Sequence, residues 1–388
     1  MITSVRIKGY KILRDVEIKP AKLTVLVGPN GCGKSSVLEV TEGAVRRLVG
    51  ESGPDLPTFA SRPSMDRLLV ALEDAAAGGG LVLDFHRTSD PGLRWILDDW
   101  LANPMFNVER LELRRRALWP LVRLRFSHDH LVAPTPAATG TPTLTPAGDG
   151  LATLVNHLAS RRDGSLERIE EGVRKVVPAF RRLGTEETTA QVWHDLGSSP
   201  QQLQRQPLPG HRLLVTIDGV GEIPAEQVSE GTMFVIGLLS YLHLQAARIV
   251  LLDDVDRGLH PKAQLELVGL LRGVTELPDS PQIIATAHSP MLLAGLREGE
   301  IVRLDLDDTR GCVVVEERAG PPGWMTINEI LDHYFGVQRP ALGADLQRYA
   351  LLAGDPRRSD VEDAELSELR ARLLAADLDP GIEPVGRV

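Results

Sequence analysis

A glycine-rich segment, Gly28–Ser35, constrains this chain more than any other part of its sequence. It reads GPNGCGKS and fits the phosphate-binding pattern G-x-x-x-x-G-K-S/T. The residues before it, Leu23–Val27, are apolar and rich in β-branched side chains, as in a buried parallel strand, and Ser36–Val45 has apolar residues at helical spacing. Strand, glycine loop and helix therefore occur in the order that phosphate binding needs, which favours a nucleotide site over a glycine loop that binds nothing.

Each part of this segment has a chemical role to fill. The glycines allow backbone N–H groups to close around a β-phosphate, and the start of the helix adds positive potential there. The Lys34 ammonium is placed to reach the β- and γ-phosphates, and the Ser35 hydroxyl to hold Mg²⁺. The expected nucleotide-binding residues of the loop are Asn30, Gly31, Cys32, Gly33, Lys34, Ser35 and Ser36.

Two later strands end in polar residues that complement the loop. The apolar run 248–252 ends in Asp253 and Asp254, and the run 283–287 ends in His288. A carboxylate at the carboxyl end of a parallel strand lies beside the phosphate loop, so Asp253 is expected to ligate Mg²⁺ and Asp254 to orient or deprotonate a water. A lone histidine at a strand end is more often structural, but in this combination His288 is a candidate γ-phosphate sensor.

Composition limits the classes of partner. The net charge is −10, so binding to nucleic acid requires a local basic patch. Two cysteines give no disulfide framework, and the opening residues lack the apolar core of a signal peptide, so we expect a cytoplasmic protein. The most apolar region, 233–252, is interrupted by polar residues and is expected to be a buried helix and strand, with no membrane partner. One cluster is open to two readings, a solvated strand face or a nucleic-acid-facing patch: Arg110, Arg114, Arg115, Arg116, Arg123 and Arg125.

Hydrophobic spacing predicts the other elements. We expect two antiparallel strands within 5–18, strands at 81–86, 121–126 and 211–217, a hairpin turn at Asp218–Gly219, and two strands within 301–315. Helices are expected at 65–77, in two pieces within 151–183, and after the capping box at Ser359. The Pro/Thr-rich segment 132–148 is expected to be flexible, and the pattern of 184–210 predicts no structure.

Taken together, these motifs resemble the ABC-class ATPases. Ser229–Thr232 resembles their signature motif, Leu251–Asp254 the Walker B motif, Gly258–Pro261 the D-loop, and His288 the switch histidine. The N-terminal VRIKGYKILRDVEI, the SEGT signature and the GLHP and TAHSP tags place the resemblance in the RecF/SMC/OLD-like branch, among bacterial AAA_21-type ATPases, rather than among transporters. The resemblance covers about residues 1–45 and 148–335.

The resemblance implies an α/β P-loop NTPase fold of the ABC-type head. Its mixed central sheet would carry an antiparallel N-terminal subsheet, a helical insertion and a helical C-terminal tail. The implied division is 1–60 for the N-terminal half of the head, 61–205 for the insertion of strands and a helical lid, 206–318 for the C-terminal half of the head, and 319–388 for the tail.

The resemblance also implies a function. ATP and Mg²⁺ would be the cofactors, with Ser35 and Asp253 on the metal and Asp254 and His288 catalytic. Two chains would form an ATP-sandwich homodimer in which Ser229 and Gly231 of one close over the γ-phosphate held by Lys34 of the other. Relatives of this branch suggest a switch in DNA metabolism or anti-phage defence, with DNA as a candidate partner and a separate effector such as a nuclease.

The chain departs from the family pattern at two places. Asp254 stands where the family usually has Glu, and the shorter side chain is expected to slow hydrolysis by about a hundredfold. No glutamine occurs between Lys34 and Gln191, so the Q-loop residue has no assignment by type.

Three other functions are compatible with some of these features. An ATPase subunit of a membrane transporter would need a Q-loop and a shorter spacing between phosphate loop and signature. A chain with its own nuclease would use the D-x-D of Asp305–Asp307, which fits a polar turn better. A structural protein with an inactive site would not keep the expected chemistry at nearly every ATP-facing position.

Overall fold

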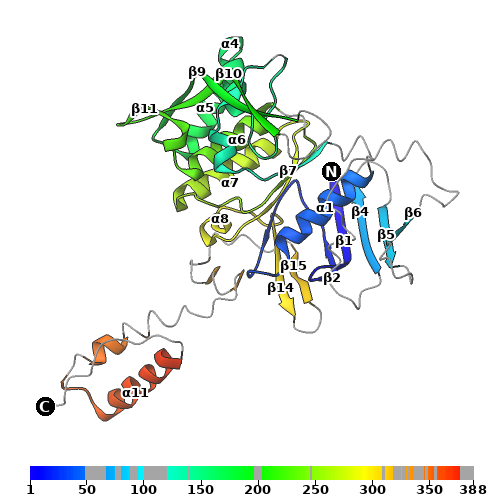
Figure 1. Cartoon of the computed structure of the whole chain (residues 1–388). Helices are drawn as coiled ribbons and strands as arrows, with labels where there is room; N and C mark the ends of the chain where they lie inside the picture. The colour runs from blue at the N-terminus through cyan, green and yellow to red at the C-terminus, as the bar shows by residue number, and fades with distance from the viewer. Residues whose placement is uncertain are drawn as a thin grey trace. The chain divides into compact units, whose positions relative to one another are not determined.

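The computed structural model divides the chain into two compact units, Met1–Pro322 and Gly323–Val388 (Figure 1). Across the part of the chain that it describes, no helix combines the length and the apolar character needed to cross a membrane. The described residues are 1–48, 67–74, 80–87, 95–99, 120–138, 140–195, 203–244, 247–307, 311–317, 325, 329–330, 333–334, 345, 348–353 and 356–375.

A six-stranded sheet forms the centre of the first unit. Its strand order is β15-β14-β3-β13-β12-β7, and every pairing is parallel except that of β14 with β15. All residues of β3, β12 and β13 are buried, as expected for strands covered on both faces. The strands are β3 (Leu23–Val27), β7 (Leu121–Leu124), β12 (Ile249–Leu252), β13 (Gln282–Thr286), β14 (Ile301–Asp307) and β15 (Gly311–Glu317).

An antiparallel sheet of five strands lies at the N-terminal side of the first unit, in the order β2-β1-β4-β5-β6. It confirms the strands expected within 5–18 and at 81–86. The helix expected at 65–77 is wrong for its described part, because Arg67–Asp74 is strand β4 and pairs with β1 on one side and β5 on the other. The strands are β1 (Ile2–Tyr10), β2 (Leu13–Ile18), β4 (Arg67–Asp74), β5 (Gly80–Arg87) and β6 (Trp95–Asp99).

Helix α1 (Lys34–Leu48) packs between these two sheets (Figure 1). It contacts β1 and β4 of the antiparallel sheet and β7, β12 and β13 of the central sheet. Strands β4 and β7 both come from the stretch 61–205 that was expected to be an insertion, so this stretch also supplies strands to both sheets of the head. The fold matches the expected mixed sheet with an antiparallel N-terminal subsheet.

The first unit also contains a third sheet, against which two of its helices pack. Strand β10 pairs with β8, β9 and β11, and helices α4 and α5 pack on the hairpin that β9 and β10 form. Strands β9 and β10 account for the described residues of the stretch 184–210, for which the sequence predicted no structure. The elements are α3 (His128–Val132), β8 (Thr135–Pro136), α4 (Leu151–Arg161), α5 (Ser165–Val176), β9 (Phe180–Asp195), β10 (Leu203–Ile217), β11 (Gly221–Pro224), η3 (Ala225–Gln227), α6 (Glu230–Leu244), α7 (Pro261–Thr275) and α8 (Pro290–Ala294).

The segment 132–148, expected to be flexible, is tied to the fold by backbone hydrogen bonds at its described residues. Arg125 N donates to Pro146 O at 2.8 Å, Ser127 N donates to Ala147 O at 3.0 Å, and Ala137 N donates to Pro209 O at 2.9 Å. Composition alone did not indicate these bonds, because they use main-chain groups rather than a side-chain pattern.

The second unit contains helix α11 (Asp360–Ala375), which begins at the expected capping box. The backbone N–H of Ser359 donates to Glu362 Oε2 at 2.7 Å, and the N–H of Glu362 donates to Ser359 Oγ at 3.4 Å. A small core holds this unit together: Tyr349, Leu352, Ala353, Leu366, Leu369 and Leu373.

Candidate nucleotide-binding and catalytic site

The glycine-rich loop joins β3 to α1 in a shape that only glycine permits at two positions. Gly28 has φ +144°, and a Cβ there would lie 2.0 Å from the carbonyl oxygen of Leu304. Gly33 has φ +103°, and a Cβ there would lie 2.7 Å from Leu13 Cδ2. Both glycines therefore let the loop bend tightly against its neighbours while the N–H groups at the start of α1 stay available.

The side chain of Lys34 is buried within this loop. Its Nζ donates to the carbonyl oxygens of Gly28, at 2.8 Å, and Pro29, at 3.0 Å. Burial is the largest influence on Lys34 and lowers its pKa, although the nearby carboxylates oppose this. The ammonium is thus held at the loop, where a phosphate would compete for its hydrogen bonds.

A cavity of about 350 Å³ opens at the mouth of the loop. Of the expected loop residues, Asn30 lies exposed at the tip, and Cys32 is buried beneath, where burial raises the pKa of its thiol. The other expected loop residues all line the cavity, and His288 reaches it from the end of β13. Its lining is Lys11, Ile12, Gly31, Gly33, Lys34, Ser35, Ser36 and His288.

Asp253 follows the end of β12, two strands away from β3 in the central sheet, and is hydrogen-bonded to the glycine-rich loop. Ser35 Oγ and Thr286 Oγ1 each donate to Asp253 Oδ1 at 2.8 Å, and Arg123 Nη2 donates to Oδ2 at 2.5 Å. Burial alone would raise the pKa of Asp253, but the hydrogen bonds from Thr286, Arg123 and Ser35 together bring it below its usual value. Asp253 is therefore an ionised carboxylate fixed beside the phosphate loop.

The oxygen atoms of Ser35 and Asp253 are suitable ligands for a Mg²⁺ ion that arrives with a nucleotide. Within the described ranges, no group of three or more His, Cys, Asp or Glu side chains is arranged to hold a metal ion. Mg²⁺ commonly takes one carboxylate together with phosphate oxygens and water. The Ser35 hydroxyl and the Asp253 carboxylate are oxygen donors of this kind, and they already lie together.

Asp254 and His288 also come together. His288 Nε2 lies 3.2 Å from Asp254 Oδ1, and the backbone N–H of His288 donates to Asp256 Oδ2 at 2.9 Å. Asp254 has φ +48°, a left-handed conformation that aspartate tolerates better than most residues, and its N–H donates to Thr286 Oγ1 at 2.8 Å. The structure thus brings both expected catalytic residues to the carboxyl ends of adjacent strands.

The expected signature residues begin helix α6. Ser229 Oγ accepts a long hydrogen bond, 3.4 Å, from the N–H of Thr232, as a helix-capping serine does. Gly231 lies so close to the D-loop that a Cβ on it would be 2.1 Å from the carbonyl oxygen of Gly258. Neither Ser229 nor Gly231 lines the cavity at Lys34 of the same chain.

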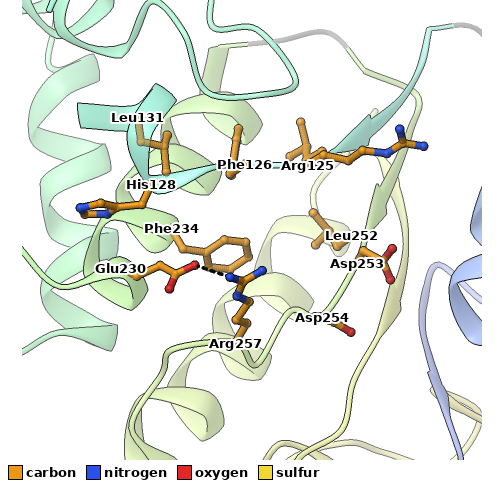
Figure 2. A pocket seen from close by; sticks show the side chains of 11 residues that line it. Arg125, Phe126, His128, Leu131, Glu230, Phe234, Leu252, Asp253, Asp254 and Arg257 are labelled. Carbon is orange, nitrogen blue, oxygen red and sulfur yellow. Dashed lines mark ion pairs between the residues drawn. The ribbon is translucent and has the colours of Figure 1, made fainter. Parts of the chain in front are cut away.

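A second cavity, of about 310 Å³, lies between the end of β12 and the start of α6 (Figure 2). An ion pair between Glu230 and Arg257, 3.1 Å, closes one side of it, and Phe126 and Phe234 meet edge to face with ring centres 6.2 Å apart. Its lining is Leu124, Arg125, Phe126, His128, Leu131, Glu230, Phe234, Leu252, Asp253, Asp254 and Arg257.

Sequence reasoning missed two residues of the site, Thr286 and Arg123. Thr286 is a polar residue at the end of the buried strand β13, and this was the only signal for it. Arg123 was grouped with a basic cluster, but it is 7% exposed and paired with Asp253, so it is neither a solvated face nor a nucleic-acid contact. Arg125 is exposed and bonds to Glu42 at 3.1 Å. The four other arginines, at 110, 114, 115 and 116, lie outside the described residues.

The fold and these residues define a P-loop ATPase of the ABC/SMC-like class. Residues 48–294 match the family described as "AAA domain, putative AbiEii toxin, Type IV TA system", and the chain belongs to that family. Residues 1–42 match the family described as "AAA ATPase domain". Both matches are to families of ATP-hydrolysing enzymes.

Curated proteins match shorter stretches of the chain. The chain is 27% identical to the Septu protein PtuA of Bacillus mycoides (strain KBAB4) over 159 residues, which are 38% of this chain and 22% of that protein. It is 34% identical to the hemin import ATP-binding protein HmuV of Rhodopseudomonas palustris (strain BisB5) over 67 residues, 16% of this chain and 26% of that protein. The chain thus spans about a quarter or less of these curated relatives.

A solved structure shows the same fold. The SmcHead bound to the C-winged helix domain of ScpA superposes with a TM-score of 0.53 at 15% identity, covering 81% of this chain and 96% of that chain.

Proposed function

We propose that this ATPase is a slowly hydrolysing switch that forms an ATP-sandwich homodimer and acts with a separate effector in anti-phage defence. The observation that carries the proposal is the convergence of Ser35, Asp253, Asp254 and His288 from three segments of the chain at one edge of the central sheet. The similarity to the Septu protein PtuA supports the setting in defence.

The residues at this edge divide the work of phosphoryl transfer to water. Lys34 and the loop N–H groups would bind the β- and γ-phosphates, while Ser35 and Asp253 would hold Mg²⁺, which neutralises phosphate charge when it is bound. Asp254 is the candidate base for the attacking water. His288 Nε2 lies 3.2 Å from Asp254 Oδ1 and would orient the Asp254 carboxylate. We expect slow ATP turnover because the side chain of Asp254 is one methylene shorter than the Glu that the family usually has there.

The dimer is supported by the placement of the signature residues. Ser229 and Gly231 stand at the start of α6, and the N-terminus of a helix attracts anions through its N–H groups and dipole. They do not line the Lys34 cavity of their own chain, which supports the proposal that they would meet a phosphate held by a second chain. Nucleotide binding would then hold the dimer together, and hydrolysis would release it.

The test is the oligomeric state, measured by size exclusion with light scattering. Wild-type protein with Mg²⁺ and a non-hydrolysable ATP analogue should be dimeric, and Lys34→Ala should not bind the analogue. Ser229→Arg should bind the analogue and stay monomeric. Ser367→Arg, at an exposed serine of α11, is the matched control and should dimerise as wild type does. Dimers of Ser229→Arg that match those of wild type would refute the sandwich.

DNA is a second candidate partner. The stretch 161–182 is also rich in arginine and is a further candidate surface for DNA. Several of its arginines are paired with nearby acids: Arg161 with Asp163, Arg181 with Asp218, and Arg182 with Glu222. Retention of DNA on a filter that depends on ATP, and that Lys34→Ala abolishes, is the expected result if DNA is bound. No retention of any DNA form at low salt would remove DNA from the proposal.

The second candidate function is the ATPase subunit of a membrane transporter, which the short match to HmuV favours. The two proposals differ in their partner. Co-purification with an integral membrane protein would support transport, whereas co-purification with a soluble nuclease would support the defence switch.

A further inference from the structure

Arg123 is a buried cation bonded to an expected metal ligand. It lies on β7, the strand next to β12, in register with Leu251, two residues before Asp253. Its side chain is 6% exposed, Nη2 donates to Asp253 Oδ2 at 2.5 Å, and Nη1 lies 4.0 Å from Glu42 Oε2. Its Nε is buried and has no hydrogen-bond partner among the described residues.

A buried arginine is costly unless its partners compensate, so its position calls for an explanation. The site edge gathers three carboxylates, Asp253, Asp254 and Asp256, against one buried lysine, Lys34. Of the cations in the described ranges, Arg123 is the one that bonds directly to Asp253. It therefore offsets negative charge at the point where Mg²⁺ would have to be received.

The two oxygens of Asp253 have different partners. Oδ2 faces Arg123, whereas Oδ1 accepts hydrogen bonds from Ser35 and Thr286. A partial rotation of the carboxylate about its Cβ–Cγ bond would break all three bonds, so Arg123 helps to fix the plane of the carboxylate and leaves its other oxygen toward the Ser35 hydroxyl. Groups that hydrogen-bond a metal ligand commonly set its orientation and the affinity of the site for metal.

We propose that Arg123 is a positioning residue that holds one oxygen of Asp253 and so fixes the plane of the carboxylate with the other oxygen toward Ser35, and that it thereby sets the affinity of the nucleotide site for Mg²⁺. This inference rests on the proposed function, since it concerns the metal that accompanies ATP. It assigns Arg123 no contact with the nucleotide.

The test is the binding of a fluorescent ATP analogue measured across a series of Mg²⁺ concentrations. Arg123→Met should need about 10- to 100-fold more Mg²⁺ for half-maximal binding. Arg125→Gln is the matched control, because Arg125 lies two residues along the chain and bonds Glu42 but not Asp253, and it should leave the Mg²⁺ requirement unchanged. Arg123→Lys, which keeps the charge but loses the planar fork, should fall between wild type and Arg123→Met.

Thermal unfolding separates positioning from support of the fold. A purely structural arginine would lower the melting temperature and leave the Mg²⁺ requirement unmoved, and that result for Arg123→Met would overturn the proposal, as would a lower Mg²⁺ requirement. If Arg123→Met does not fold, Arg123→Lys carries the test, and an unchanged requirement there overturns the proposal. Wild-type protein that binds no nucleotide at any Mg²⁺ concentration would instead refute the proposed function.

Discussion

Gly231, at the start of α6, and Gly258, in the expected D-loop, lie with their backbones in direct contact. A Cβ on Gly231 would lie 2.1 Å from the carbonyl oxygen of Gly258, and Gly258 itself has φ +70°. The ion pair between Glu230 and Arg257 joins the same two segments beside this contact (Figure 2). A movement of the start of α6 must therefore move the D-loop as well.

Gly231→Ala should destabilise the first unit by about 2 kcal/mol, because the added methyl group has no space against a backbone oxygen. Chemical denaturation measures the change in the free energy of unfolding. Gly269→Ala, at an exposed position of α7 where a Cβ meets nothing, is the control and should instead stabilise the protein by about 0.5 to 1 kcal/mol. Equal stability of Gly231→Ala and wild type would contradict the close contact.

Asp254→Glu should raise the rate of ATP hydrolysis, by up to about a hundredfold, because the longer side chain brings the carboxylate nearer to the water that it activates. Steady-state phosphate release at saturating Mg-ATP measures this rate. The position has φ +48°, so the variant is also expected to be slightly less stable. A turnover equal to or below that of wild type would argue against Asp254 as the base.

Glu300 should give the first unit a stability that is lost in acid. Burial raises the pKa of Glu300, but its bonds to Arg272 and to the N–H of Arg297 outweigh burial and hold it below its usual value. Because the folded pKa is depressed, the contribution is present above the unfolded pKa, about 4.3, and disappears as the pH falls through the folded value.

Glu300→Gln should therefore cost about 2 kcal/mol at pH 7, and the difference from wild type should shrink below about pH 4. Urea denaturation at the two pH values measures it. Glu276→Gln, which removes an exposed pair with Arg297, is the control and should cost less than about 1 kcal/mol. A constant difference across pH would show that the Glu300 charge is not what stabilises the pair.

Ser359→Ala should weaken the second unit by about 1 kcal/mol, because it removes the cap at the start of α11. Hydrogen exchange of the amides in α11 reports this loss locally. Ser367→Ala is the control, since the hydroxyl of that exposed serine donates to the Asp363 carbonyl within the helix, and its loss should change exchange little. Unchanged protection of α11 in Ser359→Ala would mean that the capping box contributes nothing.

The sequence predicted the elements that are determined by residues close to one another in the chain. The buried strand β3, the helix after the glycine loop and the cap at Ser359 each have a signal within a few residues. Strand β4 was mistaken for a helix because Leu68, Leu69 and Leu72 fit both periods, and the pairing of β4 with β1 decided between them. The hairpin of β9 and β10 likewise depends on long-range pairing that a polar sequence does not reveal.

The residues of the candidate site also fall into two groups, those that a sequence motif predicts and those that only the structure reveals. Lys34, Ser35, Asp253, Asp254 and His288 were predicted because each stands at a motif, and the structure brings them to one edge of the sheet. Arg123 and Thr286 were missed because their importance lies in what they contact. A residue in a supporting position has no sequence signature of its own, and only the register of β7 with β12 placed Arg123 beside the Walker B strand.

The position of β3 between β13 and β14 has a consequence during synthesis of the chain. The strand that carries the glycine loop leaves the ribosome early, but its neighbours follow only after residues 282–286 and 301–307 are made. At about 5–20 residues per second, that interval is on the order of tens of seconds. Until it ends, the nascent loop has no companion strands, so a prematurely terminated product would contain the glycine-rich motif yet have no competent nucleotide pocket.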